Sequence, residues 1–291
     1  MIYWLNGDFH TEKEMLRIDD RGFLLGDGIF ETMLVRNGSP AFWDRHMARL
    51  SAGLSELHID VDVAGQLGGD GNGFCQNLAT KNDLGNADAS LRIAVSRGSG
   101  PRGIGIEAPM SPTVIATIAP APMRGPGFEN LGRHLHVSRY RRPAASVTSR
   151  IKTPAYLDNI LALKEAVNAG RDEALMLNEA GRVSCASTAN IFLLGKDGTI
   201  TTPPIDEGAL PGIVRAVLID ECRKNGVTVK EEPIELGEVQ LSDFALTNSL
   251  IGAIPARLDH RPEAPGEVFN QFNAWYQAAL CDDLNQRASV V

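Results

Sequence analysis

The stretch Ser149-Arg150-Ile151-Lys152-Thr153-Pro154-Ala155-Tyr156-Leu157 places a lysine just before a predicted helix, and the rest of the chain is interpreted around it. Tyr156 begins a helical pattern that runs to Ala169, and Gly170 is well suited to the position after the helix end. A strand, a turn and the segment Val183-Ser184-Cys185-Ala186-Ser187-Thr188-Ala189-Asn190-Ile191-Phe192 follow. Most lysines are solvated surface charges, so Lys152 acquires meaning only from the residues that accompany it elsewhere.

Length and composition describe an ordinary globular protein. The chain has 291 residues, of which 43% are hydrophobic and 22% charged, which suits one large domain or two medium ones. Its formal net charge of -8 argues against a nucleic-acid-binding surface, which requires a basic patch. The four cysteines form no CxxC pair and no metal-ligand spacing, so we expect free thiols and no metal site.

Targeting signals are not evident in the sequence. The first residues, Met1-Ile2-Tyr3-Trp4-Leu5-Asn6-Gly7-Asp8, lack the basic and apolar regions of a signal peptide. No apolar run approaches the ~18 residues of a membrane span. We therefore expect a cytoplasmic protein without membrane association.

Strand and turn signals predict an α+β fold in two domains. Asn6-Gly7 and Asn37-Gly38 are strong hairpin signals in the first half. Asp44 is a suitable N-cap for a helix through about Leu57, and a final helix is expected from Pro265 to Leu284. The Pro- and Gly-rich residues 119–127 predict an interdomain linker between a small α+β domain, residues 1–118, and a large domain, residues 128–291.

Three motifs together resemble a known family. They are Asp20-Arg21-Gly22-Phe23-Leu24-Leu25-Gly26-Asp27-Gly28-Ile29-Phe30-Glu31-Thr32, then His46-Met47-Ala48-Arg49-Leu50, and Lys152 before its helix. The chain resembles the fold-type IV pyridoxal-phosphate enzymes from its first strand to about Ala256. These include branched-chain aminotransferases, D-amino-acid aminotransferases and aminodeoxychorismate lyases. The resemblance implies a two-domain fold like that of D-amino-acid aminotransferase, pyridoxal 5'-phosphate as cofactor, a small-molecule substrate and a homodimer.

The resemblance also assigns the cofactor-binding residues. Lys152 matches the lysine that binds the cofactor covalently and moves the substrate proton. Arg49 matches a phosphate ligand, although a helix arginine on the surface is the alternative. Two segments resemble the phosphate cup, Gly212-Ile213-Val214 and Thr247-Asn248-Ser249. The first has an independent reason, because a helix N-terminus offers unpaired N–H groups to an anion.

Two further cofactor positions are less regular. Tyr156 is expected to bond the phenolic oxygen of the cofactor, although its spacing from Lys152 differs by one residue from that of the family. Cys185 stands where the family places a glutamate that pairs with the pyridine nitrogen. A neutral thiol would not keep that nitrogen protonated. Cys185 therefore indicates a weaker electron sink, a different use of the cofactor, or simply a small buried residue.

Four residues are expected on the substrate side. Phe30 and Glu31 lie on the strand that lines it, and Phe30 replaces a tyrosine usual in D-amino-acid aminotransferases. Arg97 and Arg102 belong to the loop Arg97-Gly98-Ser99-Gly100-Pro101-Arg102-Gly103, which is most similar to the lyase loop. Arg102 matches a position that holds the substrate carboxylate, and the planar fork of arginine suits that task.

The reaction remains open between three alternatives at this level. The loop at 97–103 and the segment from Thr247 to Pro255 favour aminodeoxychorismate lyase, which releases pyruvate and 4-aminobenzoate for folate biosynthesis. A class IV aminotransferase of the branched-chain or D-amino-acid type would use the same proton abstraction. Cys185 raises the third alternative, a catalytically impaired cofactor-binding protein, against which Lys152 and Arg49 argue.

Overall fold

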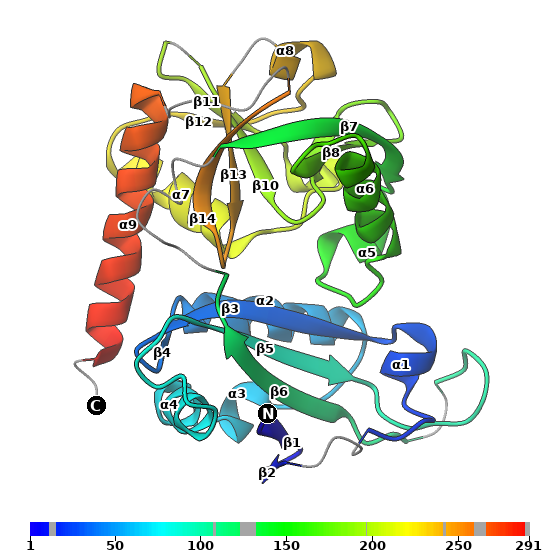
Figure 1. Ribbon diagram of the computed structural model, residues 1–291. Helices are drawn as coiled ribbons and strands as arrows, with labels where there is room; N and C mark the ends of the chain where they lie inside the picture. Colours follow the sequence, from blue (N-terminus) through cyan, green and yellow to red (C-terminus); the bar gives the residue numbers. More distant parts are fainter. Residues whose placement is uncertain are drawn as a thin grey trace. The chain divides into compact units, whose positions relative to one another are not determined.

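The computed structural model describes residues 1–11, 16–106, 109–122, 132–195, 197–240, 243–258 and 266–288 (Figure 1). The chain divides into two compact units. Unit 1 comprises Met1–Pro122, Lys152–Ala155 and Asp282–Val291, and unit 2 comprises Met123–Ile151 and Tyr156–Cys281. The predicted division was by contiguous halves, whereas this grouping assigns the Lys152 segment and the C-terminal segment to unit 1. Most of the predicted linker, residues 123–127, lies outside the described residues.

Unit 1 is built on an antiparallel six-stranded sheet in the order β2-β1-β6-β5-β3-β4. The two Asn-Gly hairpins are confirmed, with positive φ at all four turn residues. The elements are β1 (Tyr3–Leu5), β2 (Asp8–His10), α1 (Arg21–Leu25), β3 (Gly28–Arg36), β4 (Ser39–Pro40), α2 (Trp43–Glu56), α3 (Val63–Gln66), α4 (Asn72–Lys81), β5 (Ala89–Ser96) and β6 (Thr113–Pro120).

Helix α2 covers β3 through an apolar stripe. Met47, Leu50 and Leu54 are buried as their helical spacing predicts. The predicted N-cap at Asp44 was wrong, because the helix begins at Trp43 after Phe42, which has a left-handed backbone and gives no side-chain cap. Asp44 lies in the first turn, where its charge still complements the helix dipole.

Unit 2 contains an eight-stranded mixed sheet in the order β12-β11-β10-β13-β14-β7-β8-β9. The pairs β11–β12, β14–β7 and β7–β8 are parallel. The elements are β7 (Arg133–Arg142), α5 (Val147–Arg150), α6 (Leu157–Asn168), β8 (Glu173–Asn178), β9 (Val183–Ala186), β10 (Asn190–Leu194), β11 (Ile200–Thr202), the 3-10 helix η2 (Ile205–Glu207), α7 (Ile213–Lys224), β12 (Val229–Glu231), α8 (Leu236–Gln240), β13 (Asp243–Asn248), β14 (Gly252–Arg257) and α9 (Glu267–Ala288), whose last residues belong to unit 1.

Two apolar clusters hold unit 2 together. The larger one joins β7–β10, β13 and β14 to α8 and includes Leu177, Ile191 and Phe244. The smaller one lies where α6 packs on β7 and β8, and it contains Ala162, Ala166, Ala174, Met176 and Cys185. Small side chains on α6 let the helix approach the sheet closely, so Cys185 is part of a tight interface.

Candidate active site

Lys152 is attached to unit 1 through its backbone. Strand β4 pairs with the end of β3, at Val35 and Arg36. At Phe30, nearer the start of β3, the backbone N–H donates a hydrogen bond of 2.8 Å to the Lys152 carbonyl. The Lys152 ammonium lies 4.4 Å from the centroid of the Phe30 ring. A short segment from a distant part of the sequence thus places the predicted catalytic lysine beside the predicted substrate-side aromatic residue.

Arg92 contacts the same ring and was missed by the sequence analysis. Its guanidinium carbon lies 3.6 Å from the Phe30 centroid, within cation–π range. On β5 it pairs with Thr32 of β3, which puts it on the same face of the sheet as Phe30. The available signal was the alternation of Leu91, Ile93 and Val95, which leaves Arg92 facing away from the core.

Glu31 points to the opposite face of β3 and anchors Arg49. The Arg49 guanidinium donates to both carboxylate oxygens, at 2.7 Å from Nε and 2.6 Å from the second nitrogen. The His46 Nδ1 lies 2.7 Å from the same carboxylate. Glu31 and His46 are each 1% exposed. The contacts of Glu31 therefore favour the positioning of Arg49 over the direct substrate contact expected from the sequence.

The charges in this cluster determine its titration. Burial alone would raise the pKa of Glu31, but Arg49 and His46 outweigh it and hold the pKa at about 2. Burial lowers the pKa of His46; Glu31 opposes this, and the positive charges of Arg49 and Lys152 add to it. At neutral pH Glu31 is thus ionised and His46 is neutral.

We expect the cluster of Glu31, His46 and Arg49 to make the free energy of unfolding decrease at acidic pH. The pKa of Glu31 in the folded protein, about 2, lies below its ordinary value of 4.5. The contribution of ionised Glu31 to the free energy of unfolding is therefore complete above pH 4.5 and is lost as the pH falls towards 2. It amounts to about 3 kcal/mol at neutral pH. The pKa of His46 is also lower in the folded protein than its ordinary 6.5. His46 therefore causes a further loss of folding stability, which begins as the pH falls below 6.5. Urea unfolding between pH 7 and pH 3 measures the slope, and Glu31→Gln should flatten it; an equal slope in both proteins would contradict the assignment.

The two arginines of the 97–103 loop differ in their surroundings. Arg97 is buried, and its guanidinium donates to both oxygens of Asp27 and to the carbonyls of Leu57 and His58. Those contacts favour a structural role, because they tie the loop to the end of α2. Arg102 is exposed, with no hydrogen bond or ion pair among the described residues.

Unit 2 offers an anion-binding group at the start of α7. The helix follows Gly212 without a side-chain cap, so the N–H groups of Ile213 and Val214 have no acceptor within the helix. Asn190 organises this end: its amide donates to the Leu210 carbonyl, and a Cβ at position 212 would overlap its side-chain oxygen. Glycine at 212 is thus needed for close packing.

The Thr247 hydroxyl completes this group. Thr247 pairs with Asn190 across β10 and β13, and its Oγ1 is buried without a hydrogen-bond partner among the described residues. An unsatisfied buried hydroxyl next to an uncapped helix N-terminus fits a phosphate, which could accept from both. Asn248 instead closes the following turn: it donates to the Thr188 carbonyl and accepts from the N–H groups of Leu250 and Ile251. Ser249 follows in the same turn.

Cys185 is buried in the small cluster under α6. Burial raises the pKa of its thiol, and Arg142 and a hydrogen bond with Ser184 only partly oppose this, so the thiol is neutral at pH 7. Tyr156, the remaining predicted cofactor ligand, is the half-buried N-cap residue of α6.

The sequence analysis also missed a buried carboxylate, Glu173, on β8 beside the strand β9 that contains Cys185. Glu173 accepts hydrogen bonds from the Ser187 N–H and hydroxyl and from the Thr188 hydroxyl, the last at 2.6 Å. Both of its oxygens are thereby used to hold the β9–β10 turn. The only sequence signal was a glutamate at the start of a strand that is otherwise apolar.

The described residues contain no helix that is long and apolar enough to span a membrane. Within the same residues, His, Cys, Asp and Glu side chains form no group of three that could hold a metal ion.

Comparisons with known proteins agree on one family. The family described as "Amino-transferase class IV" matches residues 28–258. A putative branched-chain-amino-acid aminotransferase of Methanocaldococcus jannaschii is 32% identical over 273 residues, which cover 93% of this chain and 90% of that protein. An aminodeoxychorismate lyase of Bacillus subtilis is 31% identical over 257 residues, covering 88% and 85%.

A solved structure supports the same conclusion. The 4-amino-4-deoxychorismate lyase from Pseudomonas aeruginosa matches with a TM-score of 0.81 at 31% identity, covering 97% of this chain and 99% of that one. The fold-type IV architecture expected from the resemblance is therefore confirmed. The chain belongs to the class IV aminotransferase family of pyridoxal-phosphate-dependent aminotransferases and lyases.

Proposed function

We propose that this protein is a pyridoxal-phosphate-dependent lyase that converts aminodeoxychorismate into 4-aminobenzoate and pyruvate. The observation that carries the proposal is the Phe30 ring, which holds the Lys152 ammonium at 4.4 Å and the Arg92 guanidinium at 3.6 Å. A base and a carboxylate-binding cation beside one aromatic surface suit a flat, acidic ring substrate. The similarity to lyases of Bacillus subtilis and Pseudomonas aeruginosa supports the same choice.

The cofactor would be held by the residues that match the family's cofactor ligands. In this proposal Lys152 bonds it covalently, while the first turn of α7, Thr247, Ser249 and Arg49 receive its phosphate. Arg49 is suited to this because Glu31 fixes its guanidinium plane. Tyr156 would bond the phenolic oxygen. When bound, the cofactor supplies an electron-withdrawing ring joined to the substrate nitrogen.

The chain's own residues carry the remaining steps. The Lys152 amine takes the proton from the carbon that bears the substrate nitrogen. The C–O bond on the neighbouring carbon breaks, the ring becomes aromatic, and the leaving enolpyruvate takes up a proton to become pyruvate. Arg92 and Arg102 bind the two substrate carboxylates. Formation of the aromatic ring drives the elimination, so the reaction places a modest demand on the electron sink.

A paired assay tests the proposal. Purified protein loaded with pyridoxal phosphate is given aminodeoxychorismate, and 4-aminobenzoate and pyruvate are both quantified. We expect the two products in equal amounts. Turnover of L-leucine or D-alanine with 2-oxoglutarate, without 4-aminobenzoate release, would overturn the lyase assignment. Cofactor binding without either reaction would instead support the catalytically impaired protein.

The second candidate is a class IV aminotransferase. The relative from Methanocaldococcus jannaschii, a putative branched-chain-amino-acid aminotransferase, is as similar to this chain as the lyases are. The same Lys152 would then move the substrate proton during amino-group transfer, and no C–O bond would break. The assay above separates the two because only the lyase releases 4-aminobenzoate without a keto-acid acceptor.

We expect Arg92→Leu and Arg102→Leu each to raise the KM for aminodeoxychorismate. A hydrogen bond to a charged group contributes about 1.5–3 kcal/mol, which corresponds to roughly 10- to 100-fold. The affinity for pyridoxal phosphate should stay within about twofold, since neither residue is assigned to the cofactor. Arg92→Lys keeps the charge and should retain part of the effect. An equal loss of cofactor and substrate affinity would contradict the assignment.

The variant Cys185→Glu tests whether residue 185 on β9 contacts the pyridine nitrogen of the cofactor. If Cys185 faces the pyridine nitrogen, a glutamate should form a charge-assisted hydrogen bond, shift the absorbance of the bound cofactor and speed exchange of the substrate α-proton. Against this, the thiol is packed with Ala162 and Ala166, and a buried glutamate without a partner destabilises a fold. A folded, cofactor-loaded variant with an unchanged spectrum would show that Cys185 does not face the ring. Cys185→Gln is the matched control, because glutamine has the volume of glutamate without its charge.

We further propose that the protein is a homodimer joined through the α1 surface, defined as Ile18, Phe23, Leu24, Leu25 and Ile104. Ile18, Phe23 and Ile104 are 88%, 80% and 87% exposed. Arg21 ties α1 to the loop by donating to the carbonyls of Gly103 and Ile104. Large exposed apolar side chains on two segments that are joined in this way are typical of an interface.

A second copy is the favoured partner for the α1 surface. The family resemblance implies a homodimer, and an apolar patch can pair with itself about a two-fold axis. The net charge of -8 on each chain opposes association, so the apolar contact must outweigh it. Light scattering after size exclusion should give a dimer for the native protein and a monomer for Phe23→Asp combined with Ile104→Asp. Ile160→Asp, on an exposed position of α6, is the control and should stay dimeric. A native monomer would overturn the dimer, and a dimeric double variant would overturn this surface.

A further inference from the structure

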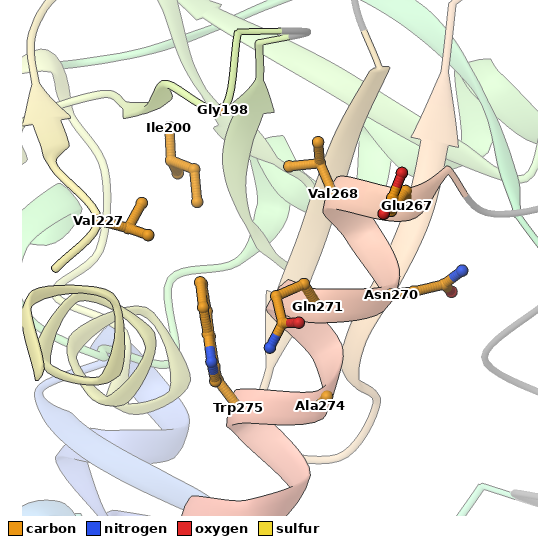
Figure 2. A pocket seen from close by; sticks show the side chains of 9 residues that line it. All are labelled: Gly198, Ile200, Val227, Glu267, Val268, Asn270, Gln271, Ala274 and Trp275. Atoms are coloured by element: carbon orange, nitrogen blue, oxygen red, sulfur yellow. The ribbon is translucent and has the colours of Figure 1, made fainter. Parts of the chain in front are cut away.

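Unit 2 has a hollow between the first half of α9 and the β11–β12 end of its sheet, and none of the predicted site residues lines it (Figure 2). Ile200, Val227 and Trp275 enclose an apolar space (Figure 2). The Glu267 and Asn270 side chains are directed away from that space, so its one charged lining residue does not meet a molecule held there (Figure 2). Charged side chains that do converge lie in unit 1, around a single carboxylate.

Asp27 joins two buried arginines. Its Oδ2 accepts hydrogen bonds from the Nε of Arg21 at 2.8 Å and from the Nε of Arg97 at 2.9 Å, and its Oδ1 accepts from a second Arg97 nitrogen at 3.1 Å. Arg21 and Arg97 are 3% and 9% exposed. Burial raises the pKa of Asp27, but Arg97 and Arg21 outweigh it and hold that pKa below its ordinary value. The three residues form the Asp27 bridge, in which one ionised carboxylate fixes the planes of two guanidinium groups.

The two arginines of the Asp27 bridge hold opposite ends of one loop, residues 97–105. Arg97 stands at the beginning of the loop and donates to the backbone carbonyls that follow α2. Arg21 reaches the other end, where it donates to the carbonyls of residues 103–105 at 2.9, 3.3 and 3.2 Å. Arg102 directly precedes these three anchored residues, so its backbone is held by a contact one residue away.

The composition of the loop makes these contacts necessary for its order. Four of the nine residues from 97 to 105 are glycine. Glycine loses more conformational freedom on ordering than any other residue, so an unanchored loop of this kind would have to be ordered by the ligand. The Asp27 bridge supplies that order beforehand, and preorganisation of this kind increases affinity.

From these contacts we infer that Asp27 is a positioning residue for substrate binding. By holding Arg21 and Arg97, it keeps the loop in the conformation in which Arg102 receives a substrate carboxylate. The inference rests on the proposed function for the role of Arg102, and it deepens that proposal by naming the group on which the arginine depends. Asp27 acts through the two arginines and needs no contact with the substrate.

Trypsin measures the order of the loop without any substrate. Arg102 is exposed and is followed by glycine, so cleavage after it reports how often the loop opens. In the cofactor-loaded protein, Asp27→Asn should speed this cleavage about tenfold or more, the effect of losing one charged hydrogen bond. Fragment masses identify the site, and cleavage after Lys164 should keep its rate.

Asp88→Asn is the matched control for the tryptic assay. It removes the same charge from unit 1 by breaking the ion pair with Arg36 at the far end of β3, and it should leave cleavage after Arg102 unchanged. Equal acceleration after Arg102 and Lys164 in Asp27→Asn would indicate a general loss of stability. That result, or no acceleration at all, would overturn the inference.

Steady-state kinetics connects the loop to the substrate. Asp27→Asn should raise the KM for aminodeoxychorismate about tenfold, with little change in kcat and with cofactor affinity within about twofold. In protein that already carries Arg102→Leu, Asp27→Asn should raise the KM no further, because the loop has lost the arginine that it positions. An undiminished effect in that background would show that Asp27 acts by another route, and the inference fails.

Arg21→Met is a second variant, since removal of the carboxylate between two buried arginines can prevent folding. It abolishes the contacts with residues 103–105, leaves Asp27 paired with Arg97, and should reproduce both effects. If the paired assay identifies an amino acid in place of aminodeoxychorismate, the lyase proposal fails and the KM values are compared for that acid. Unchanged KM and unchanged tryptic cleavage in both variants would instead overturn the inference and leave the lyase proposal intact.

Discussion

Lys152→Ala should lower kcat/KM for 4-aminobenzoate release by at least about a thousandfold. Positioned acid–base catalysis contributes about 10²–10⁴-fold, and the variant also loses the covalent bond to the cofactor. The fold should be kept, because the contact with β3 is made by the Lys152 carbonyl and not by its side chain. Steady-state assays with equal amounts of folded protein measure the loss.

Lys164 provides the control for Lys152. It is an exposed lysine on α6, and Lys164→Ala should leave turnover unchanged. Borohydride reduction of the native protein with its cofactor, followed by peptide mass analysis, should place the label on Lys152. A label on another lysine, or turnover that survives in Lys152→Ala, would remove Lys152 from the catalytic role.

Glu31→Ala should lower the free energy of unfolding by about 3–5 kcal/mol, the cost of removing one partner from a buried ion pair. The Arg49 guanidinium would lose the carboxylate that accepts two of its hydrogen bonds, and His46 would lose its partner at Nδ1. Because the orientation of Arg49 depends on Glu31, the affinity for pyridoxal phosphate should fall as well. Urea unfolding and a cofactor titration measure the two effects.

A double variant separates the charge effect from packing. Replacing a buried ion pair by apolar residues of similar volume is often neutral, so Glu31→Leu with Arg49→Met should recover much of the stability. It should not recover cofactor affinity, since Arg49 is absent. A loss in Glu31→Ala below about 1 kcal/mol, the value of a surface ion pair, would contradict the buried cluster.

Local signals predicted individual elements well where a single residue type decides the backbone. Asn6-Gly7 and Asn37-Gly38 form the expected hairpins, because asparagine and glycine tolerate the positive φ that a tight turn requires. Gly170 ends α6 with the expected positive φ. The start of α2 was missed, because Phe42 adopts a left-handed backbone that its sequence does not signal.

Contacts between distant segments were not predictable from local pattern. Nothing near Lys152 indicates that its carbonyl meets β3, more than a hundred residues earlier in the chain. The contacts of Glu31 were not predictable either. A glutamate inside an apolar strand is equally consistent with a residue that binds a ligand and with a residue that pairs with other buried side chains. Its two partners, His46 and Arg49, were both visible in the motif, and their spacing of three residues on a helix could have suggested a shared target.

The grouping of the last residues with unit 1 has a consequence for synthesis of the protein on the ribosome. Asp283 accepts a hydrogen bond from the Phe42 N–H, and Arg287 forms an ion pair with Asp44, so both contacts brace the beginning of α2. Those two residues follow their partners in the chain by 241 and 243 positions. Domains that are contiguous in sequence can fold as soon as they leave the exit tunnel. These two contacts of unit 1 can form only after residues 123–281, most of which belong to unit 2, have been synthesised, so the beginning of α2 reaches its final packing late.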